Sequence, residues 1–268
     1  MVHLAETVTA ICLRSIEYTE RSRIATYLSR ESGKLDVLLS QAKGAKAKHG
    51  GASELGGIFN LHIRPSKAGS SLCRLEQYEV HTSLHFAKSL NYEAYEALMP
   101  CLELMRLFAI AFDEDATKRQ RLFAQYEALL TLWQQAEEAD FLQWSKLWFW
   151  QGILGLSGQL PPWGWDVVHQ RPIAWQGEAD QQLLYQPKEG GLALFPTKVM
   201  LKDGIEQWGM SYGVWKSLCV LETLQNETFS TLLDVPQPPL ATLKKVEAFY
   251  LAVLKTHEIH LKSCYSRV

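Results

Sequence analysis

No apolar run in the sequence approaches the roughly 18 consecutive residues that a membrane-spanning helix requires. The first ten residues do not place a basic segment before an apolar one, so no secretory signal peptide is predicted. Hydrophobic residues make up 47% of the chain and charged residues 21%, which is typical of globular proteins with a buried core. These features predict a cytoplasmic protein that does not contact membranes.

Cysteine is scarce and scattered along the chain, at Cys12, Cys73, Cys101, Cys219 and Cys264. The number is odd and no two cysteines are separated by two residues. This spacing argues against a disulfide framework and against a cysteine-based zinc site. We expect reduced thiols that pack as small hydrophobic side chains.

The sequence also lacks the short motifs of common enzymes. It contains no G-x-S-x-G nucleophile elbow, no Walker A loop, no G-x-G-x-x-G loop and no H-E-x-x-H metal motif. His257 and His260 lie three residues apart, but His257 falls on an apolar helix stripe and is expected to be a core or boundary side chain. We predict that the protein is not an enzyme. A hydrolase or transferase with its site between two domains is the alternative, which a deep pocket with convergent acids would favour.

Charge is distributed unevenly along the chain. Residues 1–75 contain 11 Lys and Arg and 6 Asp and Glu, a net charge of +5, whereas the remaining residues contain 16 and 23, a net charge of −7. Within the basic part, Lys43, Lys46, Lys48 and His49 lie on a stretch of small residues that follows a predicted strand. Lysine is a mobile point charge that can follow a phosphate backbone, so this loop is a candidate nucleic-acid contact. A solvated loop without a ligand is the alternative.

Two kinds of periodicity divide the chain. Up to about residue 80, short segments rich in β-branched and apolar residues alternate with turn residues, which predicts five strands in a small barrel or sandwich. These segments are Thr7–Arg14, Arg23–Arg30, Lys34–Ser40, Ile58–Arg64 and Leu72–Val80. From Tyr92 to about Gly155 the spacing is helical, and it becomes helical again from Gly209, with a final helix expected over 240–265.

Proline and glycine interrupt the helical part over about 157–203, where we expect an irregular insertion without long regular elements. Tryptophans are concentrated between Trp133 and Trp175. Aromatic residues at helical spacing are usually part of a core, so we expect these rings to be buried. Stacking on nucleic-acid bases is the alternative, and it requires exposed rings.

Two blocks of sequence resemble the RecO family of recombination mediators. Residues 14–35 read Arg14-Ser-Ile-Glu-Tyr-Thr-Glu-Arg-Ser-Arg-Ile-Ala-Thr-Tyr-Leu-Ser-Arg-Glu-Ser-Gly-Lys-Leu35, similar to the family pattern R-x-Y-x-E-x-x-R-I-x-T-x-L-T-x-E-x-G-K-L. The stretch Lys43-Gly-Ala-Lys-Ala-Lys48 is similar to the basic loop of the family. Residues 249–263 resemble its last helix, which ends in L-K-S.

The resemblance implies an α+β architecture with a five-stranded OB-fold barrel over residues 1–80 and a helical domain over 81–268. It implies no catalysis. Instead, it implies binding to single- and double-stranded DNA, annealing of complementary strands coated with single-stranded-DNA-binding protein (SSB), and work with RecR to load RecA, all at the nucleoid. The basic surface of the barrel would add five cations to the loop: Arg14, Arg21, Arg23, Arg30 and Lys34.

The resemblance also implies that the helical domain captures the acidic C-terminal tail of SSB in an apolar groove with basic residues at its rim. Candidate cations for the carboxylates of the tail are Lys118, Arg119, Arg121 and Lys146. The alternative is that these cations only solvate a helix connection.

The chain departs from the family pattern at the insertion. Zinc-binding members carry four cysteines there, but residues 161–171 and 188–196 contain none. We therefore expect no metal and no other cofactor, with apolar packing of Trp163, Trp165, Leu192, Leu194 and Phe195 in place of zinc. The loop also carries Lys where the family often has Arg, which predicts modest DNA affinity. A generic single-strand nucleic-acid-binding OB protein that does not anneal strands remains the alternative function.

Overall fold

The computed structural model describes residues 6–45, 47–65, 71–81, 92–109, 115–135, 138–196, 208–225, 231–259 and 261. The chain divides into two compact units. The first contains residues 1–135 together with 262–268, and the second contains residues 136–261. Each unit has its own secondary structure and its own core.

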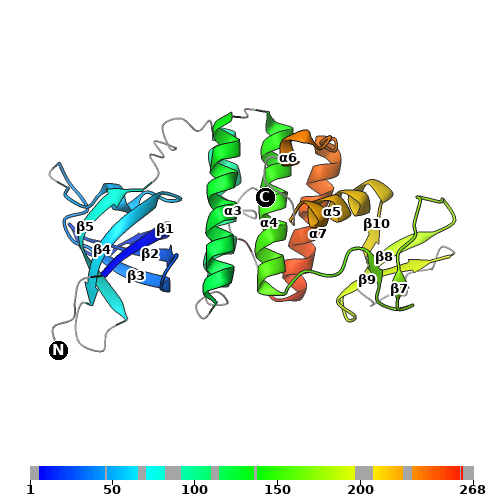
Figure 1. Ribbon diagram of the computed structural model, residues 1–268, viewed down its shortest axis with the longest axis horizontal. Helices are drawn as coiled ribbons and strands as arrows, with labels where there is room; N and C mark the ends of the chain where they lie inside the picture. The colour runs from blue at the N-terminus through cyan, green and yellow to red at the C-terminus, as the bar shows by residue number, and fades with distance from the viewer. Residues whose placement is uncertain are drawn as a thin grey trace. The chain divides into compact units, whose positions relative to one another are not determined.

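The first unit begins with a closed five-stranded barrel (Figure 1). Its strands are β1 (Glu6–Glu17), β2 (Arg23–Ser29), β3 (Gly33–Leu39), β4 (Ile58–Pro65) and β5 (Leu72–Val80). They follow the order β1-β2-β3-β5-β4, in which β3 and β5 are parallel and the other neighbours are antiparallel. This arrangement confirms the predicted OB-fold barrel, with all five strands near their predicted positions.

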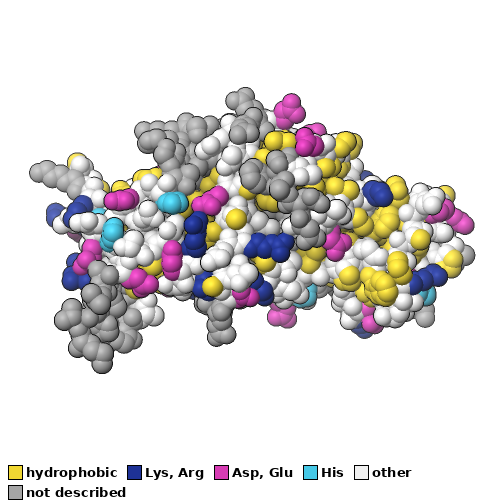
Figure 2. Space-filling model, viewed as in Figure 1, with side chains coloured by type: hydrophobic (Ala, Val, Ile, Leu, Met, Phe, Trp, Pro, Cys, Tyr) yellow, Lys and Arg dark blue, Asp and Glu magenta, His cyan; other side chains and the backbone are white. Residues whose placement is uncertain are grey.

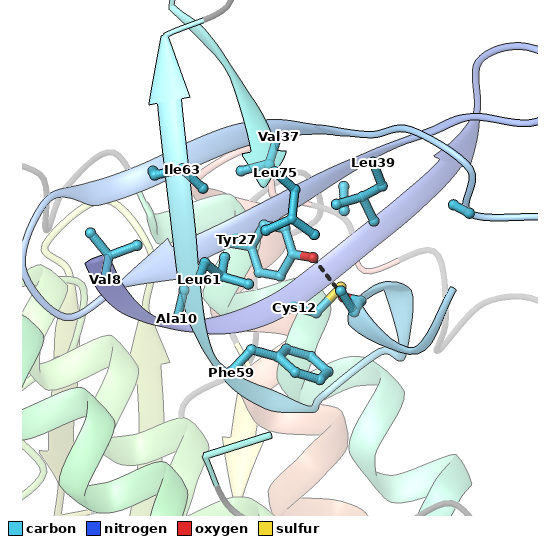
Figure 3. Close-up of a cluster of buried hydrophobic side chains, with 13 residues drawn as sticks. Val8, Ala10, Cys12, Tyr27, Val37, Leu39, Phe59, Leu61, Ile63 and Leu75 are labelled. Carbon is cyan, nitrogen blue, oxygen red and sulfur yellow. Dashed lines mark hydrogen bonds between the residues drawn. The ribbon is translucent and has the colours of Figure 1, made fainter. Parts of the chain in front are cut away.

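Alternating side chains of the strands fill the barrel interior. On β2, Ala25 and Tyr27 are fully buried in a core that also contains Val37, Phe59 and Leu75 (Figure 3). The buried hydroxyl of Tyr27 donates a hydrogen bond to the carbonyl of Ala52, in the short 3-10 helix η1 (Gly51–Ser53), at 2.5 Å. Because strand side chains alternate between faces, the residues between these core positions point outward.

Two helices complete the first unit, α2 (Tyr92–Phe108) and α3 (Ala116–Gln135). The Tyr126 hydroxyl of α3 donates a hydrogen bond to the carbonyl of Gly56 at 2.8 Å. Gly56 has a φ of +80°, and a Cβ atom there would lie 2.8 Å from this hydroxyl, so the close approach requires glycine. The barrel and both helices thus belong to one compact unit, which contains residues 1–135 together with 262–268.

The second unit contains the helices α4 (Ala139–Ser157), α5 (Tyr212–Leu224), α6 (Thr231–Asp234) and α7 (Leu240–Thr256). Trp144 and Trp150 of α4 are fully buried. Trp163 is also fully buried, and its indole ring contacts Phe249 and Tyr250 of α7 edge to face. These aromatic rings form a core, as their spacing predicts.

Over its described residues the insertion contains no long element, as expected, but its short strands form a small sheet that was not predicted. Its strands follow the order β10-β8-β9-β6-β7. They are β6 (Trp165–Asp166), β7 (Arg171–Pro172), β8 (Gln182–Gln186), β9 (Gly191–Phe195) and β10 (Trp208–Met210). No strand exceeds five residues, because proline and glycine separate them at short intervals. Sequence periodicity does not show such short strands, so this sheet was missed.

The last helix also differs from its prediction. α7 ends at Thr256, and Glu258 adopts a φ of +59°, so the described residues 257–259 do not continue the helix to residue 265. His257 is exposed rather than part of the core, and His260 lies outside the described residues. The apolar spacing continues past the helix end, which made the helix look longer than it is.

Candidate nucleic-acid interface

The basic loop after β3 begins beside the turn that joins β1 to β2. The backbone N–H of Ala42 donates to the carbonyl of Arg21 at 2.8 Å. The Lys43 ammonium lies 3.0 Å from a carboxylate oxygen of Glu17 and donates to the carbonyl of Thr19 at 3.2 Å. Lys48 is exposed, and Lys46 lies outside the described residues. The loop and the β1–β2 turn therefore form one end of the barrel.

The carboxylate of Glu17 partly offsets the positive charge at this end. The hydrogen bond and charge of Lys43 hold the pKa of the Glu17 carboxyl below its ordinary value, and the charge of Arg23 acts in the same direction. The Glu17 side chain is 75% exposed, so solvent screens the pair and its contribution to stability is small. Lys43 is consequently a cation that already has an anionic partner.

His49 is a buried side chain that stabilises the loop, whereas the sequence suggested a nucleic-acid contact. It is buried, and its Nδ1 lies 2.7 Å from the carbonyl oxygen of Ser40. A carbonyl accepts but cannot donate, so the ring carries its proton on Nδ1. A buried ring that stabilises the loop in this way is not positioned to contact a phosphate.

The five cations expected on the barrel strands take up different positions. Arg14, Arg21 and Lys34 are exposed. Arg23 is partly buried at the end of β2. Arg30 lies 2.9 Å from Glu127 of α3, and its guanidinium lies 4.9 Å from the centre of the Phe123 ring. Arg30 therefore stabilises the packing of α3 on the barrel, whereas the three exposed cations face solvent.

Two further arginines, which are not among the expected cations, lie on the outer face of the barrel. Arg64 of β4 and Arg74 of β5 are direct cross-strand partners, and both are exposed. They alternate with the buried residues Ile63 and Leu75, so alternation alone could have shown that each points outward. Their pairing depends on the register between two strands, which the sequence does not specify.

Aliphatic side chains continue the same cross-strand row. Arg74 is the partner of Leu38 on β3, Leu38 pairs with Ile24 on β2, and Ile24 pairs with Ile16 on β1. Ile16 is 41% exposed, and Ile24 and Leu38 are partly exposed. Figure 2 shows Lys and Arg side chains interspersed with Asp and Glu over the barrel, so its surface is mixed in charge. An apolar strip beside an arginine pair is a distinct feature of this surface.

The cations of α3 that are expected to bind the SSB tail differ in exposure. Arg119 is buried in α3, where its guanidinium donates to the carbonyls of Arg30 and Glu31 at 3.3 and 2.8 Å. Lys118 is partly exposed, and Arg121 is exposed. Arg119 therefore stabilises the turn between β2 and β3, which is a different role from the one expected.

Lys146 also has a different role from the one expected. It is buried in the second unit, and its ammonium donates to a carboxylate oxygen of Glu247 at 2.6 Å. The same ammonium lies 5.4 Å from the centre of the Trp150 ring. Lys146 thus belongs to an interior ion pair between α4 and α7 and is not part of a basic rim.

A carboxylate organises the turn of the insertion that carries His169. Asp166 is fully buried and accepts hydrogen bonds from the backbone N–H groups of Val168, His169 and Leu194 and from Nδ1 of His169. Burial by itself raises the pKa of this carboxyl, but the hydrogen bonds from His169 and Leu194 outweigh burial and lower the pKa. Within the part of the chain that the structure describes, no three His, Cys, Asp or Glu side chains are grouped as metal ligands would be.

The insertion residues expected to replace zinc are mostly interior. Trp163 and Leu192 are fully buried, Leu194 is buried, and Phe195 is partly buried. Trp165 is 39% exposed and differs from the expectation. Among the described helices, none is long and apolar enough to span a bilayer.

The barrel topology defines the class of the first unit, which is an OB-fold. Residues 2–84 match the family model described as "Recombination protein O N terminal". A protein of Myxococcus xanthus (strain DK1622) named "DNA repair protein RecO" is 31% identical over 125 residues. That alignment covers 46% of this chain and 47% of the relative, so the chain matches about half the length of that protein. Both comparisons confirm the predicted resemblance to the RecO family, and the family match covers the barrel.

Proposed function

We propose that the protein is a recombination mediator like RecO, which binds single- and double-stranded DNA through its barrel and is not an enzyme. The observation that carries the proposal is the closed barrel of order β1-β2-β3-β5-β4 within the residues that match the RecO N-terminal family. OB-folds bind oligonucleotides across strands β2 and β3 and the adjoining loops. In this barrel Arg14, Arg21 and Lys48 are exposed cations on or next to that surface.

The finer activities of the proposal are annealing of complementary strands, cooperation with RecR and loading of RecA onto SSB-coated DNA in the bacterial cytoplasm. They are supported by the family match and by the relative named as a DNA repair protein. The single experiment that tests them is annealing of complementary oligonucleotides coated with SSB, with and without the protein. Acceleration of annealing supports the mediator. Binding of single strands without acceleration supports the generic OB protein instead.

The basic loop is the part of the proposal that mutation tests most directly. Changing Lys43, Lys46 and Lys48 together to alanine should weaken binding to any DNA sequence, because these contacts are to phosphates. Each lost phosphate contact should also flatten the dependence of log affinity on log salt by about 0.7 for a single strand. If affinity and salt dependence do not change, DNA binds elsewhere on the protein.

Capture of the SSB tail stays in the proposal, with Lys118 and Arg121 as the cations that bind it. A carboxylate-rich tail needs exposed positive charge, which Arg121 offers and the buried Arg119 and Lys146 do not. Binding of a tail peptide should therefore weaken about tenfold in Arg121→Glu, since a charged contact is worth roughly 1.5–3 kcal/mol. Unchanged peptide binding would place the tail elsewhere.

A further inference from the structure

Arg64 and Arg74 place two positive charges directly opposite each other on the outer face of the barrel. Like charges in this relationship destabilise a sheet, because directly opposite Cβ atoms are only about 4.5–5.5 Å apart. Glu76 compensates one of them, since its carboxylate lies 2.9 Å from Nε of Arg64. The Arg74 guanidinium donates a hydrogen bond to the neutral hydroxyl oxygen of Ser40 at 3.3 Å. Among the described groups, the pair therefore keeps about one positive charge in excess.

An arginine pair with one excess charge suits a phosphate group. The guanidinium is planar and donates two parallel hydrogen bonds to phosphate oxygens, and its charge persists at any physiological pH. The Arg64 side chain is 53% exposed, so its guanidinium is accessible from solvent. A phosphate bound between the two guanidinium groups would remove their mutual repulsion. The backbone of neither strand would need to move.

The residues next to the pair are apolar. Leu38 is the direct cross-strand neighbour of Arg74, and Ile24 is the neighbour of Leu38. Neighbouring strands lie about 4.8 Å apart, so a base attached to a phosphate at Arg74 is within reach of Leu38. Asp36, on the same outward face of β3, accepts a hydrogen bond from the Thr26 hydroxyl at 2.7 Å and lies in the row that includes Arg14. The Leu38 row itself contains no acid.

We propose that Arg64 and Arg74 bind one phosphate of a single nucleic-acid strand, and that Leu38 and Ile24 contact the adjoining base. The proposal rests on the proposed function and specifies its substrate. Charge alone would suit a duplex equally well, but an aliphatic surface can contact a base face only where that face is unstacked. Aliphatic side chains recognise no base edges, so the site should tolerate any base. This part of the barrel therefore favours a single strand over a duplex.

The test compares binding of a labelled oligothymidylate and of a duplex of the same length, by fluorescence anisotropy over a range of salt concentrations. The variant is Arg64→Gln with Arg74→Gln in the full chain. Its affinity for the single strand should fall about tenfold or more. Its salt slope should fall by about 0.7, the value for one phosphate on a single strand. Arg171→Gln, which removes one exposed positive charge from the second unit, is the control and should bind like the wild type.

A second variant tests the base contact separately from the phosphate contact. Leu38→Thr introduces a β-branched residue, which is well tolerated in a strand, and should weaken single-strand binding several-fold, with no change in salt slope and no change in duplex binding. The double glutamine variant should melt close to the wild-type temperature at low salt, because the loss of a like-charge pair offsets the loss of the exposed Arg64–Glu76 ion pair. That result excludes misfolding as the cause of weaker binding.

The outcomes separate this inference from the proposed function. If the wild type binds neither oligonucleotide, the proposed function itself fails. If the wild type binds and the double glutamine variant keeps its affinity and salt slope, the phosphate site is wrong while the function stands. If the double glutamine variant loses single-strand and duplex binding equally and Leu38→Thr loses neither, the preference for a single strand is overturned.

Discussion

The ammonium of Lys146 lies 2.6 Å from a carboxylate oxygen of Glu247, and the side chains are 7% and 21% exposed. The other carboxylate oxygen of Glu247 accepts a hydrogen bond from the Gln143 amide, also at 2.6 Å. This arrangement satisfies the buried charge of Lys146 and joins α4 to α7. It also means that a charge reversal at Lys146 would place two carboxylates side by side. Loss of peptide binding in such a variant would then report unfolding of the second unit and not the position of a tail site.

Removal of the Lys146 ammonium alone should destabilise the second unit. In Lys146→Met the Glu247 carboxylate loses its partner, and breaking a buried pair costs about 3–5 kcal/mol. Because Glu247 keeps some contact with water, we expect a decrease of about 2–3 kcal/mol in the free energy of unfolding. The double variant Lys146→Met with Glu247→Gln should recover most of this loss, since no charge is left buried. Urea denaturation, monitored by tryptophan fluorescence, measures the free energy of unfolding of both variants. Equal values for the single and double variants would contradict the ion pair between Lys146 and Glu247.

Arg119 should matter for the stability of the first unit and not for the recognition of a partner. Its guanidinium donates to the two carbonyls of the β2–β3 turn, so Arg119→Met leaves these groups without their donor. The expected decrease in the free energy of unfolding is about 2 kcal/mol, because hydrogen bonds to charged groups contribute roughly 1.5–3 kcal/mol. Arg121→Met, two residues further along α3 and exposed, is the control and should change stability by less than about 0.5 kcal/mol. Similar losses in both variants would mean that the turn does not depend on Arg119.

The insertion should lose stability in acid through Asp166. Its pKa is lower in the folded protein than in the unfolded chain, so the ionised carboxylate stabilises the fold above the unfolded value of about 3.9. This contribution is lost as the pH falls through the lowered folded pKa. Asp166→Asn should be less stable than the wild type at pH 7, and the difference should shrink below about pH 4. Thermal melting between pH 3 and pH 7 measures this difference, and a gap that stays constant with pH would show that the charge of Asp166 is not involved.

The barrel could be predicted from the sequence because its strands are short, alternating and separated by turn residues. Tyr27, Val37 and Leu75 all occupy interior positions that follow from alternation. The sheet of the insertion could not be predicted in the same way, since β6 and β7 are two residues long and have no period to detect. The end of α7 was missed for the opposite reason, because apolar spacing continues past the residue at which the backbone leaves the helix.

The candidate site could be predicted only in outline. Composition showed that the first part of the chain is basic, but it could not show which cations are already paired. The sequence around Arg30 and Lys43 does not reveal an anionic partner, yet each side chain contacts a carboxylate in the structure. The partner of Arg30 lies 97 residues away in α3. The pairing of Arg64 with Arg74 likewise depends on strand register, which only the folded barrel defines.

Glu17 should restrain DNA binding at the end of the barrel. Its carboxylate occupies the place of a phosphate at Lys43, with 3.0 Å between the charged atoms. Glu17→Gln removes this competing negative charge and frees the Lys43 ammonium. We expect the affinity for a single strand to rise about three- to tenfold at low salt. The salt slope should steepen by about 0.7 if Lys43 gains one phosphate.

A matched variant separates this local effect from a general change in net charge. Glu20→Gln changes the net charge by the same amount on the same turn, next to Thr19 and Arg21, and Glu20 is exposed. Because long-range effects of exposed charges are screened within about 8 Å at physiological salt, Glu20→Gln should raise affinity less than Glu17→Gln at 0.15 M salt. In the triple variant Glu17→Gln, Lys43→Gln and Lys48→Gln, the gain should disappear. Equal gains from the two single glutamine variants would show that net charge alone is responsible. A loss of affinity in Glu17→Gln would show that the carboxylate orders the loop for binding and does not compete with phosphate.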